Sequence, residues 1–210
     1  MTTYAFPSIT PNEMDVQLVS NTAIFQSPLT GAIQTLDRGG ERIQVTMTFR
    51  ALRSESSNLG AITKASWRHF MTAFIAKLNG RQHRFTLPYF PINNLGAWSG
   101  SPVVDGANQT GNSLLIDVPS TTVVPYGVAG DWFSVNGELK IVTASFNVVA
   151  DAGTVTFAPR LRASPPNSTA LISSSPSGTF ILLDDPVWTN YPGPNGPRSD
   201  LTITAIEDIS

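Results

Sequence analysis

The chain has 210 residues, of which 41% are apolar, and a formal net charge of −2. That length and apolar content are sufficient for one large all-β domain or for two smaller domains. Charged residues make up 13% of the chain, about half of their usual share, which favours a surface partly covered by other chains. The nearly neutral balance and the absence of a lysine or arginine cluster argue against a nucleic-acid-binding protein.

The sequence also restricts the redox chemistry and the location of the protein. It contains no cysteine, which excludes disulfides and thiolate metal sites. The first residues, Met1 to Pro7, lack the basic and apolar stretches of a signal peptide, and no apolar run is long enough to cross a bilayer. We therefore expect a protein that is made in the cytosol and is not inserted in a membrane.

The first segment, to about Asp37, contains Pro7, Pro11 and Pro28, each of which removes a hydrogen-bond donor from a strand. We expect this segment to form only edge strands or extended coil. Residues 42–50, in contrast, alternate strictly between apolar and polar, which predicts a strand with one buried face. The positions expected on the buried face are Ile43, Val45, Met47 and Phe49.

Residues 58–79 show the three- and four-residue spacing of an amphipathic α-helix. Ser56, Ser57 or Asn58 can cap its N-terminus. Gly80 suits a left-handed helix end. The apolar stripe consists of Leu59, Ile62, Trp67, Phe70, Met71, Phe74, Ile75 and Leu78. Because a single helix with such a stripe needs a sheet face to cover, we expect it to belong to the core.

A strand is predicted at residues 83–87, and short strands follow between Val103 and about Arg160. Asn136-Gly137 is the dipeptide most typical of a two-residue hairpin turn. The expected hairpins join residues 132–135 to 138–142 and residues 145–149 to 154–158. About sixty residues of this kind predict a small barrel of the OB or SH3 type.

The last part of the chain is expected to return to the first domain. Residues 159–169 are rich in proline and are interpreted as a linker that leaves the barrel. Residues 170–172 and 179–183 are predicted to form another hairpin. Residues 186–197 are rich in proline and glycine and are predicted to be a long loop. Residues 201–206 alternate cleanly and predict a final strand.

The predicted fold class is therefore mainly β. Residues 1–94 and 164–210 are expected to form a discontinuous β-sandwich that carries the helix at 58–79. Residues 95–163 are expected to form an inserted, small OB- or SH3-like β-barrel.

No cluster of residues predicts a reaction. His69 and His83 lack a third ligand at metal-site spacing, so the sequence gives no metal site. The adjacent Asp184 and Asp185 would point to opposite faces of a strand and cannot flank one glycosidic bond. Residues 96–100 place the serine one position late for a nucleophile elbow. We expect no catalytic residue, no cofactor and no enzymatic activity.

The aromatic residues of the predicted loops are the remaining candidates for binding. Trp98, Trp188 and Tyr191 are expected to lie in loops, where an exposed ring can stack on a glycan or anchor a protein partner. Protein contact or local packing is favoured over sugar stacking for these rings. Trp132 begins a predicted barrel strand and is expected to belong to the core.

Several landmarks occur in a characteristic order along nearly the whole chain. They are Phe25-Gln-Ser-Pro-Leu-Thr-Gly31, Arg38-Gly-Gly40, the helix with Trp67, Phe70, Phe74 and Leu78, Arg84-Phe-Thr-Leu-Pro88, Gly130-Asp131, Asn136-Gly137 and Ile206-Glu207. This order resembles that of the distal tail (baseplate hub) proteins of long-tailed bacteriophages.

The resemblance implies a structural virion protein with a β-sandwich "belt" domain, one helix and a small second domain. It implies a homo-oligomer, a hexameric ring, between the tail tube protein and the tail hub, fibre or receptor-binding proteins. DNA would pass through the ring without specific binding. The implied location is the virion tail, assembled in the cytoplasm of the bacterial host, with no catalysis and no cofactor.

An alternative function stays open at this point. The chain could be a carbohydrate-binding adhesion module of the tail tip that acts through the inserted barrel and the loop aromatics Trp98, Trp188 and Tyr191.

Overall fold

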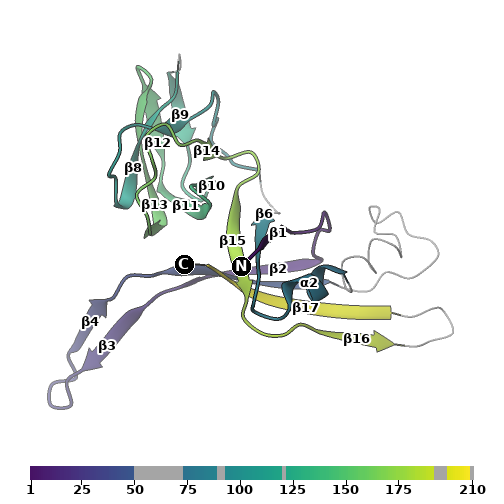
Figure 1. The fold of residues 1–210 in the computed structure, drawn as a ribbon. Coiled ribbons are helices and arrows are strands. Elements are labelled where there is room, and N and C mark those ends of the chain that lie inside the picture. Colours follow the sequence, from purple (N-terminus) through teal and green to yellow (C-terminus); the bar gives the residue numbers. More distant parts are fainter. Residues whose placement is uncertain (50–72, 89–92, 120–121, 192–197, 209–210) are drawn as a thin grey trace. The chain divides into compact units, whose positions relative to one another are not determined.

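The structure is a computed structural model that describes residues 1–49, 73–88, 93–119, 122–191 and 198–208, with the side chains of residues 188–191 and 198–200 left out (Figure 1). The protein is mainly β, as its sequence predicts. Contacts divide it into two compact units. Unit 1 comprises residues 1–17, 44–90 and 179–208, and unit 2 comprises residues 18–43, 91–178 and 209–210.

The first sheet has seven strands in the order β1–β6–β15–β17–β5–β2, and β16 also pairs with β17. Their bounds are β1 Thr3–Ala5, β2 Glu13–Val19, β5 Arg42–Phe49, β6 Arg84–Pro88, β15 Ser177–Leu182, β16 Val187–Tyr191 and β17 Arg198–Glu207. The strands β1 and β2 of the proline-containing first segment lie at the two ends of this order, so they are edge strands as predicted.

The long strand β17 holds this sheet together. It pairs antiparallel with β5 from Leu201↔Phe49 to Ile206↔Gln44. It also pairs with β15 near its end and with β16 near its start. The side chains of β5 alternate between intermediate and buried along its whole length, which confirms the predicted strand and its buried face.

The core of unit 1 contains a cluster of phenylalanine rings. Phe6 contacts Phe74 edge-on with 5.4 Å between ring centroids, and Phe85 contacts Phe74 in the same way at 5.8 Å. Phe85 also stacks on Phe180 at 6.3 Å. Rings from β6, β15, the segment after β1 and the residue before the helix therefore meet in one cluster, which adds specific geometry to the burial of apolar area.

Only the end of the predicted helix falls within the described residues, as α2 Ile75–Leu78. Phe74, Ile75 and Leu78 are buried, while Ala76 and Lys77 are exposed. The helix ends at Asn79, whose φ of 48° is left-handed, and Gly80 after it also has a positive φ. Positions 58–72 of the prediction, His69 included, lie outside the described residues.

Unit 2 contains a nearly closed, barrel-like sheet of eight strands. The main order is β14–β10–β11–β13–β12–β9, and β8 pairs with both β13 and β7. The bounds are β7 Val103–Val104, β8 Gly111–Asp117, β9 Val123–Gly127, β10 Trp132–Val135, β11 Glu138–Ala144, β12 Phe146–Val149, β13 Ala152–Leu161 and β14 Leu171–Ile172. The predicted hairpin of residues 132–135 with 138–142 is confirmed, and Asn136 and Gly137 both have the positive φ that its turn requires. β12 and β13 also form a hairpin, but it pairs Val148 with Gly153 and Val149 with Ala152. The predicted pairing of residues 154–158 with 145–149 is therefore wrong, because residues 154–158 pair with β8 and β11.

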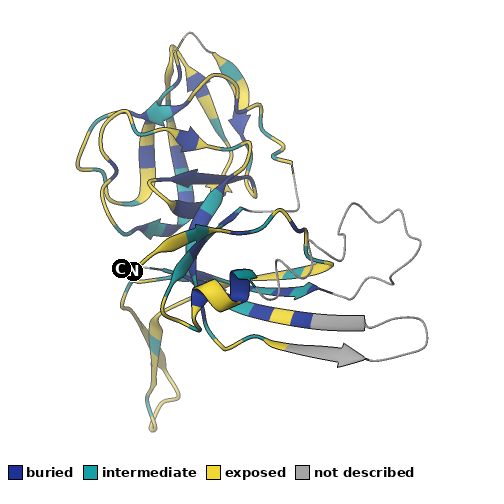
Figure 2. Ribbon diagram, turned by 45° about the vertical axis from the view of Figure 1, so that its right-hand side comes forward, coloured by how far each residue is buried: buried dark blue, intermediate teal, exposed yellow. Residues whose placement is uncertain are grey.

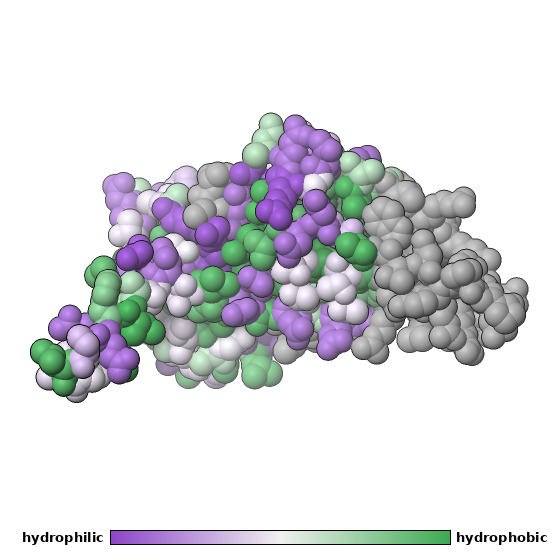
Figure 3. Space-filling view, turned by 90° about the horizontal axis from the view of Figure 1, so that it is seen from below, coloured by the Kyte–Doolittle hydropathy of each residue, from purple (hydrophilic) through white to green (hydrophobic). Residues whose placement is uncertain are grey.

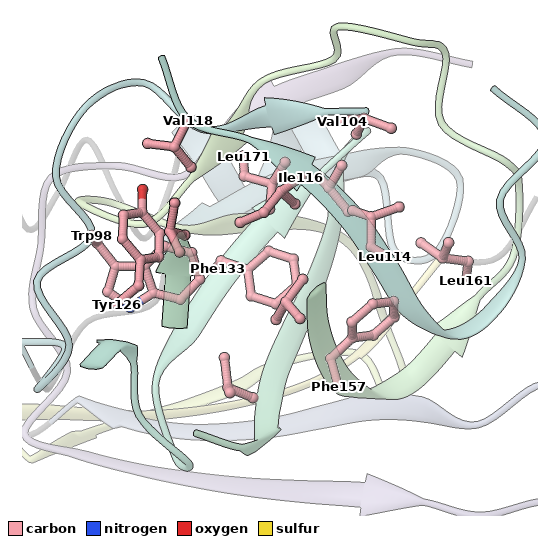
Figure 4. Packing of buried hydrophobic residues seen from close by; sticks show 14 residues of the cluster. Trp98, Val104, Leu114, Ile116, Val118, Tyr126, Phe133, Phe157, Leu161 and Leu171 are labelled. Carbon is pink, nitrogen blue, oxygen red and sulfur yellow. The ribbon is translucent and has the colours of Figure 1, made fainter. Parts of the chain in front are cut away.

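Figure 4 shows the apolar core of unit 2. Phe133, Leu114 and Val155 are fully buried. In Figure 4 Phe133 lies near the middle of the cluster, and Trp98 and Tyr126 lie side by side at one end. The expected core position of Trp132 is confirmed, because 8% of its surface is exposed.

Three sequence predictions about the last third of the chain are wrong. Residues 159–161 are not part of a linker, because β13 continues to Leu161, which joins the core of unit 2. Residues 170–172 and 179–183 form no hairpin with each other, since β14 pairs with β10 and β15 pairs with β17. Part of the predicted loop at 186–197 is the strand β16, whose five residues contain no proline. Prolines flank that strand, and the composition of the whole window concealed it.

We expect the substitution Phe85→Ala to lower the free energy of unfolding of unit 1 by about 3–5 kcal/mol, because the ring is fully buried among other rings. Urea unfolding followed by near-UV circular dichroism measures this. Val187→Thr, at a side chain that is 76% exposed, is the control and should stay within about 0.5 kcal/mol of the wild type. Equal losses in the two variants would contradict the core position of Phe85.

Candidate interaction site

The residues of unit 2 before β5 form a separate two-stranded ribbon. Strands β3 Thr22–Gln26 and β4 Ile33–Asp37 pair antiparallel from Thr22↔Asp37 to Gln26↔Ile33 and pair with no other described strand. None of their residues is buried, and only Ala23 is intermediate (Figure 2). We call residues 22–37 the arm. An isolated two-stranded ribbon is marginally stable in water, so this exposure needs a physical reason.

The arm carries large apolar side chains on both of its sides. Side chains alternate along each strand, so Ile24 and Ile33 share one side, while Phe25 and Leu36 share the other. Their exposed fractions are 68%, 65%, 54% and 52%, in that order. In Figure 3 the arm is the extension at the lower left, with hydrophobic side chains interspersed among polar ones. Both sides of the arm therefore expose apolar area to water.

The tip of the arm is an ordered turn that exposes one leucine. The Gly31 N–H donates to the Ser27 carbonyl at 2.9 Å, and the Ser27 N–H donates to the Ala32 carbonyl at 2.8 Å. Gly31 has a φ of 69°, which favours glycine. Leu29, inside this closed turn, is 95% exposed, more than any other large hydrophobic side chain among the described residues. The turn thus fixes the backbone around Leu29 and leaves its side chain accessible to a partner surface.

The arm also lacks the charges that normally protect an exposed strand edge. From Val16 to Leu36 the sequence contains no Asp, Glu, Lys or Arg. Soluble proteins usually place charged residues or short strands at free edges to prevent association. A ribbon with two free edges, large apolar side chains on both sides and its one charged residue, Asp37, at the base has the composition of a contact surface.

Charged groups gather at the base of the arm instead. Arg160 of β13 pairs with the Asp37 carboxylate through Nη2, and the same nitrogen lies 3.7 Å from Glu41 Oε1. Asp37 Oδ1 accepts the Gly39 N–H at 2.9 Å. A Cβ on Gly39 would lie 3.4 Å from Nη1 of Arg160, and the φ of Gly39 is 67°. Arg160 therefore fastens the base of the arm to the barrel-like sheet within unit 2.

Trp98, a predicted exposed contact residue, lies in the core of unit 2, so the structure corrects that prediction. Its side chain is 9% exposed and packs against Tyr126 and Phe133 at ring distances of 5.6 and 5.7 Å. The indole Nε1 donates to Asp131 Oδ2 at 2.7 Å. A buried ring cannot stack on a glycan, and the sugar-binding alternative loses this residue.

Asp131 is the group that turns Trp98 inward. It is buried and accepts four hydrogen bonds, from the backbone N–H groups of Leu95, Gly96 and Val128 and from the indole of Trp98, at 2.7 to 3.0 Å. A Cβ on Gly96 would lie 2.5 Å from the Tyr126 carbonyl oxygen, so only glycine fits there. Asp131 therefore holds residues 95–98, which overlap the segment that is excluded above as a nucleophile elbow, in a fixed conformation. We call Asp131 and its four hydrogen bonds the clamp.

The clamp also determines the charge state of Asp131. Burial alone would raise the pKa of its carboxyl group, but the four hydrogen bonds together outweigh burial. The pKa of Asp131 consequently lies below its ordinary value of 3.8. Burial acts in the same direction on the neighbouring phenol, and it raises the pKa of Tyr126 to about 12. Its hydroxyl donates to the Ser99 carbonyl at 2.7 Å and has a structural role.

Trp188 and Tyr191, the other two predicted contact residues, belong to strand β16 and not to a loop. They pair in register with Leu201 and Arg198 of β17. Their side chains lie outside the described part of the structure, so their proposed glycan or partner contacts stay a prediction.

A second buried group of charges has a structural explanation. The Nζ of Lys140 is fully buried, donates to Glu138 Oε2 at 2.6 Å and donates to the Arg160 carbonyl at 3.0 Å. Glu138 in turn accepts the backbone N–H groups of Arg162 and Ala163 at 3.2 and 3.3 Å. These bonds hold the chain after β13 against β11, which is why residues 159–163 do not leave the unit as a linker.

Little else in the described residues suggests chemistry. His83 Nδ1 accepts the Thr2 N–H at 3.4 Å, a contact that ties β6 to the N-terminal segment. The described residues contain no group of three or more His, Asp or Glu side chains that could hold a metal ion, and no helix among them is long and apolar enough to cross a membrane. The exposed arm is therefore the strongest candidate for a functional site.

Sequence reasoning did not identify the arm as a site. Two alternating runs, residues 22–26 and 33–37, flank the turn sequence Ser27-Pro28-Leu29-Thr30-Gly31 and could have predicted a hairpin. Alternation of apolar and polar residues normally indicates a strand with one buried side. The sequence does not tell whether that side is covered by the same chain or by a partner protein.

No protein-family model matches the chain, and no curated protein shows significant similarity to it.

The substitution Arg160→Met should loosen the base of the arm while keeping the apolar stem of the side chain. The pKa of Asp37 is held below its ordinary value first by the Gly39 N–H and also by the Arg160 guanidinium. We expect the pKa of Asp37 to rise and the amides of residues 38–40 to exchange faster with solvent, both measured by NMR. Arg81→Met, which removes an exposed pair with Asp184 at 3.7 Å, is the control and should leave these residues unchanged.

The substitution Asp131→Asn should destabilise unit 2 by about 2–3 kcal/mol, because an amide group replaces one of the two accepting oxygens and leaves buried donors unpaired. Since the pKa of Asp131 is lower in the folded protein, its contribution is complete well above 3.8 and is lost as the pH falls below that value. Chemical unfolding at several pH values should show the difference between wild type and variant shrinking in acid. If the difference in unfolding free energy between wild type and variant did not change with pH, Asp131 would not be ionised in the folded protein.

Proposed function

We propose that this chain is a structural subunit that forms a ring at the distal end of a phage tail and links the tail tube to the tail tip or receptor-binding apparatus. The observation that supports this best is the arm, a two-stranded ribbon with large, exposed apolar side chains on both sides and an ordered tip. Such a surface is normal for a subunit of an assembly and unfavourable for a protein that acts alone.

The architecture also suits this function. We propose that the seven-stranded sheet of unit 1 packs as the β-sandwich of a belt domain, covered by the helix that includes α2. The barrel-like sheet of unit 2 would be the small second domain, of the OB or SH3 type. Neither requires a catalytic site, and a ring subunit acts through its surfaces alone.

The proposed partners follow from the same assembly. The chain would contact copies of itself in a hexameric ring, together with the tail tube protein on one side and the hub or fibre proteins on the other. The low share of charged residues suits a ring through which DNA passes without being gripped, because binding to phosphates requires basic side chains. The proposed location is the virion tail, assembled in the cytoplasm of the bacterial host.

Negative-stain electron microscopy of the purified protein, alone and mixed with polymerised tail tube protein, tests this function. We expect sixfold rings or tubes capped at one end. Leu29→Lys, which places a charge at the tip of the arm, should reduce ring formation or capping strongly. Leu95→Lys, at another leucine that is 78% exposed, is the matched control and should assemble like the wild type. Wild-type protein that neither forms rings nor caps tubes would contradict the proposed function.

A further inference from the structure

The chemistry of the arm restricts what can cover it. Without any basic residue between Val16 and Leu36, the arm has nothing to attract the phosphates of a nucleic acid or of anionic lipids. Each strand of the ribbon has one free edge, and its N–H and C=O groups would lack partners in a hydrocarbon phase. The surface that covers the arm must therefore belong to a protein and must be uncharged, partly apolar and able to accept a β-ribbon.

Unit 2 itself exposes a surface of this kind on the outside of its sheet. Val123, Val148, Gly153 and Ile116 are neighbours across four paired strands, and Val148 and Ile116 are buried in the core. The residues next to them along each strand must therefore point outward. We call the six exposed members of this surface the outer face: Leu115, Val124, Asn147, Val149, Ala152 and Thr154.

The outer face matches the arm in both polarity and charge. Val124, Val149 and Leu115 are 68%, 60% and 50% exposed, and the other members are small or uncharged. Asp117 follows Ile116 on β8, is half-buried and pairs with Ala152, so this side of the sheet carries an acidic residue at the end of β8. Asp151 lies in the turn before β13. Apart from Asp117 this β surface is uncharged, and a surface of this composition can pack against a ribbon as two sheets pack face to face.

We propose that the arm of one copy docks on the outer face of a second copy. Within one copy, the arm and the outer face are both exposed, so the structure leaves each of them without a cover. Two different, complementary surfaces on the same chain make a head-to-tail contact, and such contacts close into rings when the rotation between copies permits. This inference rests on the proposed ring and names the surfaces that would form it.

Within the arm, the tip and the side with Ile24 and Ile33 are the better contacts. These two side chains are the most exposed of the large hydrophobic residues on β3 and β4, and Leu29 lies at the ordered tip beyond them. Residues held in a fixed geometry before binding lose less conformational entropy when they bind. The clasp of Arg160 at the base and the closed turn at the tip provide that fixed geometry.

The test uses one variant on each surface and the combination of both in one chain. Ile33→Glu places a carboxylate on the arm, and Val124→Lys places an ammonium group on the outer face. Val124 is chosen because it lies on β9, which is separated by two strands from Asp117 on β8. Sedimentation velocity measures the oligomeric state of the full chain, alone and with tail tube protein, and circular dichroism checks that each variant is folded.

We expect the wild type to oligomerise and each single variant to weaken the association at least about tenfold, since each buries an unpaired charge. The double variant Ile33→Glu with Val124→Lys should recover most of the association, because the two charges then meet between copies. Ile33→Glu with Leu95→Lys carries the same charges with the lysine outside the outer face and should not recover.

Each outcome bears on one proposal or on both. A folded Val124→Lys variant that assembles like the wild type would overturn the docking site, and so would equal recovery in the two double variants. Either result leaves the ring itself standing, because the arm would then bind a different surface. A wild-type chain that stays monomeric both alone and with tail tube protein would overturn the docking proposal together with the proposed function.

Discussion

The arm imposes a constraint that the other described parts of the chain do not relieve. Covering one large apolar side chain contributes about 1.5–3 kcal/mol, and Ile24, Phe25, Leu29, Ile33 and Leu36 are all mostly exposed. Apolar side chains on one side of a ribbon can rest on the same molecule, but here both sides carry them. A partner that covers only one side leaves the other wet, so the arm suits a position between two surfaces. Assemblies of identical subunits provide such positions repeatedly.

Three charged residues of unit 2, Glu138, Lys140 and Arg160, hold the chain in place and do not shield the exposed strands of the arm. Arg160 acts at two levels: its guanidinium holds Asp37 at the base of the arm, and its carbonyl accepts a hydrogen bond from the buried Lys140. Glu138 then holds Lys140 and the backbone beyond Arg160. The strand β13 is thereby fixed at the point where the arm is attached. Rigidity at that point lowers the entropy lost when the arm binds a partner.

The sequence predicts the local structure of this protein well and its long-range pairing less well. The alternation of β5 and the Asn136-Gly137 turn are properties of neighbouring residues, and the structure confirms both. The partner of β14 is β10, far away in the sequence, so a hairpin with the nearby β15 was a reasonable but wrong prediction. Trp98 is similar, because a carboxylate 33 residues later draws its indole into the core. Its loop sequence alone resembles that of an exposed contact.

The same limit explains why the arm was not identified as a site, and it bears on how the proposed assembly would form. A sequence pattern reports which side chains avoid water, but not whether they are covered by the same chain or by another. With few charges on the arm or the outer face, association would be neither steered nor strongly dependent on salt. Each contact would be weak until a subunit is held on both sides. Closure of a ring, or a tail tube end that holds several subunits at once, would then decide where and when the arm is covered.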